Sequence, residues 1–246
     1  MTSLTTKGFN SVGQPIGFSV EAWQPSLLPQ GSVMEGRLCR LVPIDIAEHA
    51  RDLFEAFLID DTDHNWTYLP YGPFKLFTDF KHWLGTVVNN DDPCFFSIID
   101  LSNNKAVGVA SYLRITPDAG VIEVGHIHFS PLMQGSTLST EAMYLMMSRI
   151  FDDLSYRRYE WKCDSLNQPS CCAAERLGFL FEGIFRQATL YKNRNRNTAW
   201  YSILDSEWPI IKKVFKKWLM AENFDADGNQ KTSLSTRISD AVKIIR

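Results

Sequence analysis

The segment from Val121 to Phe185 restricts the fold most, because strand-like and helix-like patterns alternate along it. The patterns predict a strand at 121–129, a helix at about 139–154, a strand at 158–165, a helix at 169–177 and a strand from 181 onward. Such alternation is typical of α/β domains, in which helices pack against a central sheet. We therefore expect one α/β domain built around this segment.

The rest of the chain adds further elements around this core. Asp45 is a suitable N-cap for a helix, and residues 94–100 and 105–114 predict a hairpin. A further hairpin, at 181–190 and 197–204, precedes a last helix. The expected organisation is an irregular N-terminal arm at 1–35, one domain at 36–222 and a polar, loosely held C-terminal tail at 223–246, of which Val242–Ile245 could dock.

Charge and cysteine content exclude several classes of protein. The 246 residues include 25 Lys and Arg against 28 Asp and Glu, a net charge of −3, which argues against a nucleic-acid partner. Five cysteines without paired spacing do not indicate a disulfide framework. The chain shows neither a signal peptide nor a membrane-spanning stretch. We expect a cytoplasmic protein with no membrane partner; nuclear access and a homodimer stay open.

A hydroxyl-rich loop with one glycine joins the strand at 121–129 to the next helix. A loop of this kind presents backbone N–H groups at a helix N-terminus, which favours binding of an anion such as a pyrophosphate. The alternative is that the hydroxyl groups only cap the helix. The candidate residues are Gln134, Gly135, Ser136, Thr137, Leu138, Ser139 and Thr140.

Two stretches resemble one enzyme family. These are GHIHFSPLMQGSTLSTEAM, at 125–143, and SLNQPSCCAAERLGFLFEGIFR, at 165–186. They resemble the GCN5-related N-acetyltransferases, in the branch of the ribosomal-protein-serine and -alanine N-acetyltransferases. The first looks like that family's strand and pyrophosphate loop, and the second like its Asn-x-x-Ser helix, Leu-Gly-Phe turn and Glu-Gly strand. The resemblance extends from about Gly36 to Trp208.

The resemblance implies a mixed, strongly twisted sheet of about six or seven strands, flanked by helices. It also implies a splay between the strands that end at Phe129 and Ser165. Acetyl-CoA would lie in that splay, with its pyrophosphate on the N–H groups of 135–140. Its pantetheine arm would pair with Ile127, His128 and Phe129 like an added strand.

The loop departs from the family's pattern at two positions. The family usually has a basic residue after the first glycine, where this chain has Ser136, and a second glycine, where it has Thr137. A threonine can offer its N–H group at negative φ but adopts positive φ only at a steric cost. The departure bears on how tightly the cofactor would bind.

Three residues are the catalytic candidates that the resemblance brings forward. Ser170 would hydrogen-bond the CoA sulfur, Asn167 would orient the cofactor arm or a water, and Glu123 would be the general base through water. Asn167 and Ser170 could equally cap the helix at 169–177. Glu123, expected on the same strand face as Gly125, Ile127 and Phe129, could be an ordinary cross-strand charge. His126 and His128 lack further ligands nearby in the sequence, so no metal is expected.

The function that follows from the resemblance is transfer of an acetyl group from acetyl-CoA to a primary amine, by direct attack and without an acetyl-enzyme. The acceptor would be a protein N-terminal α-amine or a small-molecule amine. The alternative is a non-catalytic acyl-CoA-binding or scaffold module on the same fold. The aromatic stretch at 60–77 and the turn at 190–197 are the expected acceptor walls, although the aromatic residues could instead be core.

Overall fold

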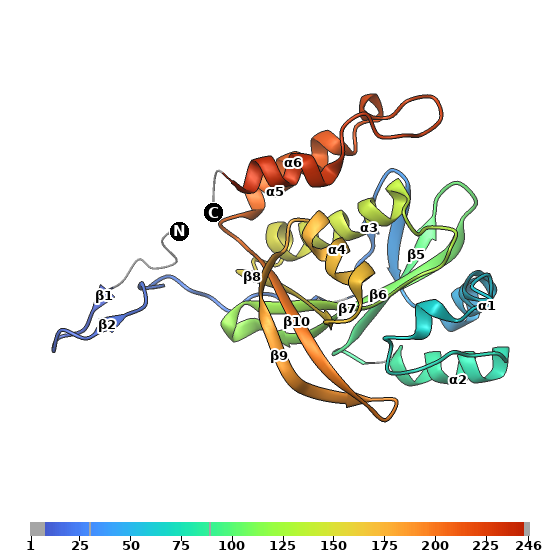
Figure 1. Ribbon diagram of the computed structural model, residues 1–246, viewed down its shortest axis with the longest axis horizontal. Coiled ribbons are helices and arrows are strands. Elements are labelled where there is room, and N and C mark those ends of the chain that lie inside the picture. Colours follow the sequence, from blue (N-terminus) through green and yellow to red (C-terminus); the bar gives the residue numbers. More distant parts are fainter. Residues whose placement is uncertain (1–7, 30, 89, 244–246) are drawn as a thin grey trace.

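The computed structural model describes residues 8–29, 31–88 and 90–243 (Figure 1). Its main sheet has eight strands in the order β3-β4-β5-β6-β7-β8-β10-β9, one more than the upper end of the expected range. The strands are β3 (Met34–Glu35), β4 (Cys39–Pro43), β5 (Cys94–Asp100), β6 (Lys105–Thr116), β7 (Val121–Phe129), β8 (Arg158–Asp164), β9 (Leu180–Tyr191) and β10 (Arg194–Leu204). Only β7 and β8 pair in parallel; the other neighbours in the sheet are antiparallel.

Six α-helices are described, together with shorter turns of 3-10 and π-helix. The α-helices are α1 (Ile46–Leu58), α2 (Phe77–Val87), α3 (Thr137–Ser148), α4 (Gln168–Arg176), α5 (Trp208–Trp218) and α6 (Leu234–Val242). The short helices are η1 (His64–Trp66), η2 (Pro117–Ala119), η3 (Arg149–Asp153) and η4 (Ala221–Asn223). No helix in the described ranges has the length and apolar character needed to cross a bilayer.

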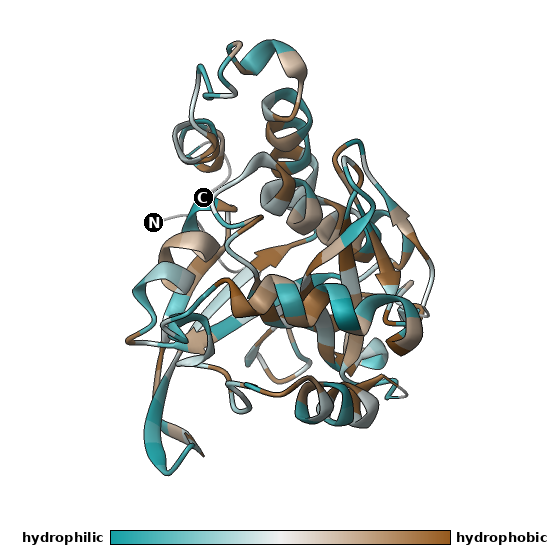
Figure 2. Ribbon diagram, turned by 90° about the vertical axis from the view of Figure 1, so that its right-hand side faces the viewer, coloured by the Kyte–Doolittle hydropathy of each residue, from teal (hydrophilic) through white to brown (hydrophobic). Residues whose placement is uncertain are grey.

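One face of the sheet is covered by α1 and α2, which Figure 2 views from in front, with hydrophilic and hydrophobic turns alternating along both helices. The side chain of Asp45 caps α1 by accepting hydrogen bonds from the N–H groups of Ala47 and Glu48, as the sequence predicted. The inward side chains of α1 include Leu53, Phe54 and Phe57, which join a core cluster with Phe80 and Phe95. This layer supports the middle of the sheet.

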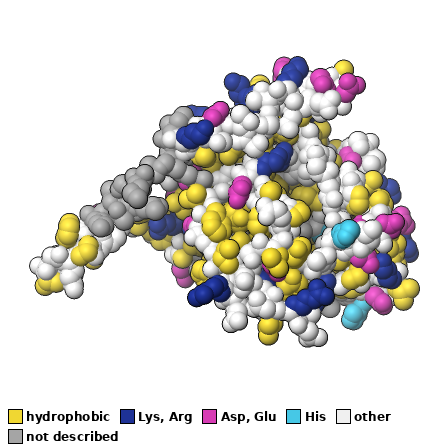
Figure 3. All heavy atoms as spheres, viewed as in Figure 1, with side chains coloured by type: hydrophobic (Ala, Val, Ile, Leu, Met, Phe, Trp, Pro, Cys, Tyr) yellow, Lys and Arg dark blue, Asp and Glu magenta, His cyan; other side chains and the backbone are white. Residues whose placement is uncertain are grey.

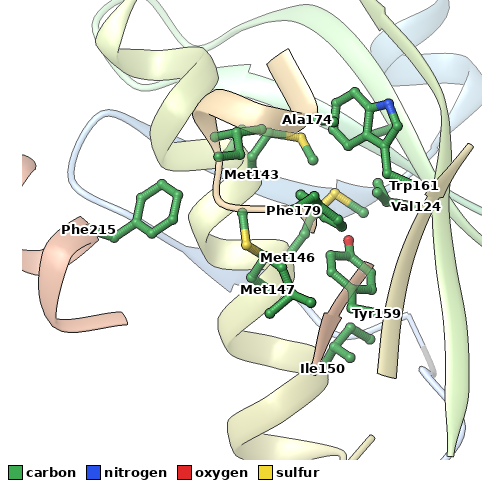
Figure 4. Close-up of a cluster of buried hydrophobic side chains, with 14 of the residues drawn as sticks. Val124, Met143, Met146, Met147, Ile150, Tyr159, Trp161, Ala174, Phe179 and Phe215 are labelled. Carbon is green, nitrogen blue, oxygen red and sulfur yellow. The ribbon is translucent and has the colours of Figure 1, made fainter. Parts of the chain in front are cut away.

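The opposite face is covered by α3, which α5 backs on its outer side. Buried methionines of α3 pack against aromatic side chains of β8 and against Phe215 of α5 (Figure 4). Because α3 contacts the sheet on one side and α5 on the other, it is apolar around much of its circumference. The side chain of Glu141 accepts hydrogen bonds from the backbone N–H groups of Arg37, Leu38 and Cys39, so α3 is also fixed to the first strands.

Two terminal predictions need correction. The arm expected to be irregular contains a small hairpin, β1 (Gly8–Phe9) with β2 (Pro15–Ile16), and ends in β3, whose Met34 is buried in the core. Residues 1–7 lie outside the described residues. The tail expected to be loosely held contains α6, whose Leu234 and Ile238 are buried in the same core. Short apolar patterns of this kind are hard to recognise without their packing partners.

The strands β7 and β8 separate as predicted. They pair only over Val121–Val124 and Arg158–Trp161, and beyond these residues the two strands have no shared ladder. A β-bulge lies in the part of β7 that pairs with β6 but not with β8. There His126 and Ile127 oppose the single residue Ala110 of β6, and His126 has a φ of +50°. On the β8 side, the backbone of β7 beyond Val124 has no strand partner in the described ranges.

Candidate active site

A cavity of about 1390 Å³ opens in the splay between β7 and β8. Its walls come from the start of α3, from α4, from the β9–β10 hairpin and from the loop at 64–70. Figure 3 shows hydrophobic side chains gathered on the face that carries β8, β9 and β10, and the hairpin side chains that line the cavity include Phe185, Leu190 and Trp200. The cavity therefore combines a polar helix start with a largely apolar hairpin wall.

The loop before α3 reaches the cavity through Gln134, Gly135 and Ser136, and the first turn of α3 reaches it through Ser139 and Thr140, whereas Thr137 and Leu138 do not line it. Gly135 carries the positive φ of the turn, +67°, and Thr137 is the first residue of α3. Thr137, at the position where the family usually has its second glycine, therefore needs no positive φ. Ser136 is the N-cap of α3, with its hydroxyl accepting from the N–H of Ser139 at 3.3 Å. The capping interpretation thus holds for Ser136, while the loop still borders the cavity.

Gln134 fixes the loop to the strand that precedes it. Its amide Nε2 donates to the backbone oxygen of Phe129 at 2.8 Å and to Oδ1 of Asn65 at 2.8 Å. These two bonds join the end of β7, the loop and η1. The side chain of Gln134 therefore positions the loop relative to the splayed strand.

The cavity is lined by Ile127, His128 and Phe129 of β7. The ring of His128 turns away toward α1 and stacks on Phe57, with 3.9 Å between the ring centroids. Burial lowers the pKa of His128 to about 3, so the ring is uncharged near neutral pH. Only the backbone of His128 is therefore placed to meet a ligand in the splay.

The predicted face of Glu123 is wrong. The bulge at His126 inserts an extra residue, so Glu123 and Gly125 lie on one face of the sheet, whereas Ile127 and Phe129 pack on the α3 side. Glu123 still lines the cavity, and its side chain is only 3% exposed.

Two cations hold the carboxylate of Glu123. Its Oε2 lies 2.7 Å from Nη1 of Arg114 and 2.8 Å from Nζ of Lys162. The Lys162 ammonium also lies 2.7 Å from Oε2 of Glu160 and 3.8 Å from the centre of the Trp200 ring. Glu123 is therefore part of an ion-pair network that is buried except for Arg114, and Arg114, Glu123 and Lys162 all line the cavity.

Asn167 and Ser170 both line the cavity at the start of α4. Asn167 is the N-cap, its Oδ1 accepting from the N–H of Ser170 at 3.3 Å. The hydroxyl of Ser170 accepts a hydrogen bond from the indole Nε1 of Trp161 at 3.0 Å. The helix-cap alternative is therefore confirmed for Asn167, whereas the Ser170 hydroxyl contacts a side chain of β8 in the splay.

The cysteines of α4 differ in their exposure. Cys171 is buried, Cys172 is exposed, and Sγ of Cys171 lies 3.6 Å from Sγ of Cys163. Burial raises the pKa of the Cys163 thiol to about 12. A thiol with so high a pKa has little thiolate near neutral pH, which disfavours a nucleophilic role.

The expected acceptor walls meet over the cavity. The hydroxyl of Tyr68 donates to the backbone oxygen of Leu166 at 3.1 Å, and Nζ of Lys192 donates to the backbone oxygen of Trp66 at 2.7 Å. Trp66, however, is buried in the α1–α2 core, as is the greater part of Phe74. Part of the aromatic stretch thus borders the cavity and part of it is core.

No sequence pattern indicated that four further residues belong to the cavity, although all of them line it: His126, Lys162, Arg176 and Trp200. The hydroxyl of Tyr71 lies 3.1 Å from Nδ1 of His126, whose pKa is lowered to about 4 by burial and by Arg114. These side chains come together only through strand pairing and helix packing, and no short motif marks them in the sequence. Among the described residues, no three His, Cys, Asp or Glu side chains cluster so as to hold a metal ion.

Comparisons with known proteins point to one family. The sequence profile of the acetyltransferase (GNAT) domain matches residues 39–180. A Bacillus subtilis (strain 168) protein named "Probable N-acetyltransferase YjcK" is 28% identical over 152 residues, which cover 61% of this chain and 77% of that protein.

Solved structures agree with the sequence match. A GCN5-related N-acetyltransferase from Brucella melitensis has 44% identity and a TM-score of 0.88, covering 89% of this chain and all of its own. A second structure, named as a probable acetyltransferase of the GNAT family from Chromobacterium violaceum, has 37% identity and a TM-score of 0.74. It covers 80% of this chain and 98% of its own.

Proposed function

Because the chain belongs to the GNAT family of N-acetyltransferases, we propose that it moves the acetyl group of acetyl-CoA to a primary amine in the splay between β7 and β8. The acceptor is a protein N-terminal α-amine or a small-molecule amine. The observation that supports this most is the cavity of about 1390 Å³, which joins the unpaired part of β7 to the start of α3.

The residues of the cavity fit an acyl-CoA. Beyond Val124 the backbone of β7 has no strand partner on its β8 side in the described ranges, so an extended amide chain could pair there. The α3 start offers backbone donors and a positive dipole end for a pyrophosphate. We propose that Ile127, His128 and Phe129 bind the pantetheine arm through their backbone, and that the loop from Gln134 to Thr140 binds the phosphates.

The proposed chemistry is direct attack of the amine nitrogen on the thioester carbonyl carbon. A new C–N bond forms, the C–S bond breaks, and the CoA thiolate leaves and takes up a proton. The acceptor ammonium, with a pKa of about 8 for a protein N-terminus and about 10 for an alkyl amine, must first lose a proton. We assign that step to Glu123 acting through a water, and stabilisation of the developing oxyanion to a backbone N–H near Ile127.

The turn at the start of α4 is assigned to the leaving group. Ser170 would donate a hydrogen bond to the departing sulfur, because its hydroxyl lines the splay while its oxygen accepts from Trp161. Asn167, whose Oδ1 caps α4, would orient the cofactor arm or a water through its NH2 group. Cys163 and Cys171 take no covalent part.

A non-catalytic acyl-CoA-binding module is the second candidate. It is favoured by the two cations on Glu123, which leave the proposed base strongly engaged. Calorimetry with acetyl-CoA, followed by an assay of free thiol release with peptides and small amines, separates the two functions. Binding with amine-dependent thiol release supports the enzyme. Binding without release for every amine supports the module, and absence of binding contradicts both.

A further inference from the structure

The loop that the phosphates of CoA would occupy carries no charged side chain of its own. Its sequence from Gln134 to Thr140 is QGSTLST. Backbone N–H groups and a helix dipole supply only partial positive charge. A pyrophosphate that loses its water in this cavity would therefore need a full positive charge from elsewhere in the fold.

Arg176 brings such a charge to this loop from another helix. It lies in the last turn of α4 and lines the same cavity as Gly135 and Ser136. Its guanidinium Nη2 donates to Oγ1 of Thr140, in the first turn of α3, at 3.0 Å. The two residues are 36 positions apart in the sequence, so the contact exists only in the folded chain.

Among the residues that the structure describes, no carboxylate pairs with Arg176. The ion pairs found among the described residues do not include it, and burial alone lowers the pKa of its guanidinium. The ring of Trp218 lies 5.5 Å from the guanidinium carbon and supports it on one side without cancelling its charge. The nearby acidic residue on α3, Glu141, is engaged by backbone N–H groups of residues 37–39. Within the described part of the chain, the half-buried guanidinium of Arg176 thus lies beside a positive helix end without a counter-anion.

We propose that Arg176 binds the pyrophosphate of the acyl-CoA, supplying from α4 the cation that the loop before α3 lacks. The inference rests on the proposed function, since it takes acyl-CoA as the ligand. An anion placed between the start of α3 and Arg176 would be attracted by both and would relieve the repulsion between them. Arginine suits this role because its planar guanidinium can donate two parallel hydrogen bonds to phosphate oxygens.

Three ligands test the assignment on the Arg176→Gln variant, and calorimetry measures the binding of the first two. The ligands are CoA, dephospho-CoA, which lacks the 3′-phosphate, and pantetheine, which lacks all phosphates. Loss of one charge-assisted contact should weaken CoA and dephospho-CoA binding by the same factor, about 10- to 100-fold. Arg176→Lys should recover part of the loss. A matched control is Arg51→Gln, which removes a guanidinium lying 3.7 Å from the Phe77 ring centre, outside the cavity.

Pantetheine distinguishes a phosphate contact from a structural role. Because it binds weakly, it is compared through kcat/KM with acetyl-pantetheine as donor, which Arg176→Gln should leave unchanged. The free variant should melt no lower than the unsubstituted protein, because an uncompensated charge is removed. An equal loss with acetyl-pantetheine, or a lower melting temperature without ligand, would overturn the assignment in favour of packing on Trp218.

The other outcomes are also decisive. A loss with CoA that disappears with dephospho-CoA would place Arg176 on the 3′-phosphate and contradict the assignment. Unchanged CoA affinity in Arg176→Gln would overturn it while leaving the proposed function standing. Failure of the unsubstituted protein to bind CoA would overturn both.

Discussion

Replacing Ser170 by alanine tests the leaving-group assignment and has a structural consequence that can be measured apart from it. The substitution removes a hydroxyl that accepts from the indole Nε1 of Trp161 at 3.0 Å, and Trp161 is only 5% exposed. A buried donor left without a partner costs about 1–3 kcal/mol. The cap of α4 survives, because Asn167 accepts from the backbone N–H of residue 170. We therefore expect a protein that folds but unfolds at lower denaturant concentration.

The effect on turnover should be separate from the effect on stability. Loss of a hydrogen bond to the departing sulfur should lower kcat by roughly a hundredfold, equivalent to about 2.7 kcal/mol, with CoA affinity nearly unchanged. Trp161→Phe removes the indole N–H, so in that background Ser170→Ala should lose little further stability but still lose its hundredfold in kcat. Urea unfolding and single-turnover thiol release measure the two quantities.

An unchanged kcat in Ser170→Ala, under conditions where single-turnover and steady-state rates agree, would contradict a role of the hydroxyl at the leaving group. The hydroxyl would then serve only Trp161. If the loss of kcat disappears in the Trp161→Phe background, the hydroxyl would act by holding the indole ring and not by contacting the sulfur. Either result removes Ser170 from the reaction.

Further predictions concern the ion-pair network, the buried histidines and the α4 cap. Glu123→Gln should lower kcat by 10²-fold or more. The control is Glu160→Gln, in the same network but outside the cavity, which should change kcat by roughly threefold or less. Equal losses of kcat for the two variants in thiol-release assays would count against a base role for Glu123. The pKa of His128 is about 3 folded against 6.5 unfolded, so stability should be constant above pH 6.5 and fall below it. His128 should contribute a slope of about 1.4 kcal/mol per pH unit that flattens below pH 3, in addition to the slope from His126, whose pKa is lowered to about 4. The total slope should therefore shrink in His128→Phe, as urea unfolding at several pH values can check. Asn167→Ala should cost about 1 kcal/mol of folding free energy through the lost cap, and Asn167→Asp should recover most of it.

Local signals in the sequence predicted much of the fold. The apolar and β-branched residues of β5 and β7 predicted the bounds of both strands correctly, and Asp45 caps α1 as expected. The splay between β7 and β8 was also predicted, because the resemblance extends over both strands. These features depend on neighbours in the sequence or on a recognisable motif.

The features that were missed depend on contacts between distant residues. The bulge at His126 arises from the register between β7 and β6, which no local pattern reveals. Because of the bulge, Glu123 lies on the sheet face opposite to that of Ile127 and Phe129. The short strand β3 and the helix α6 are ordered by burial of a few apolar side chains against the core, Leu234 among them. Arg176 reaches the loop before α3 only because α4 packs beside it. Tertiary packing therefore decided what local propensity left open.

A crystal structure with CoA bound tests the central claim most directly, namely that the splay is the acyl-CoA site. The pantetheine arm should lie along Ile127–Phe129 as an added strand, with the pyrophosphate at the N-terminus of α3 and the sulfur within hydrogen-bond distance of the Ser170 hydroxyl. CoA bound outside the splay, or a sulfur directed away from α4 with β7 left unpaired beyond Val124, would contradict the account.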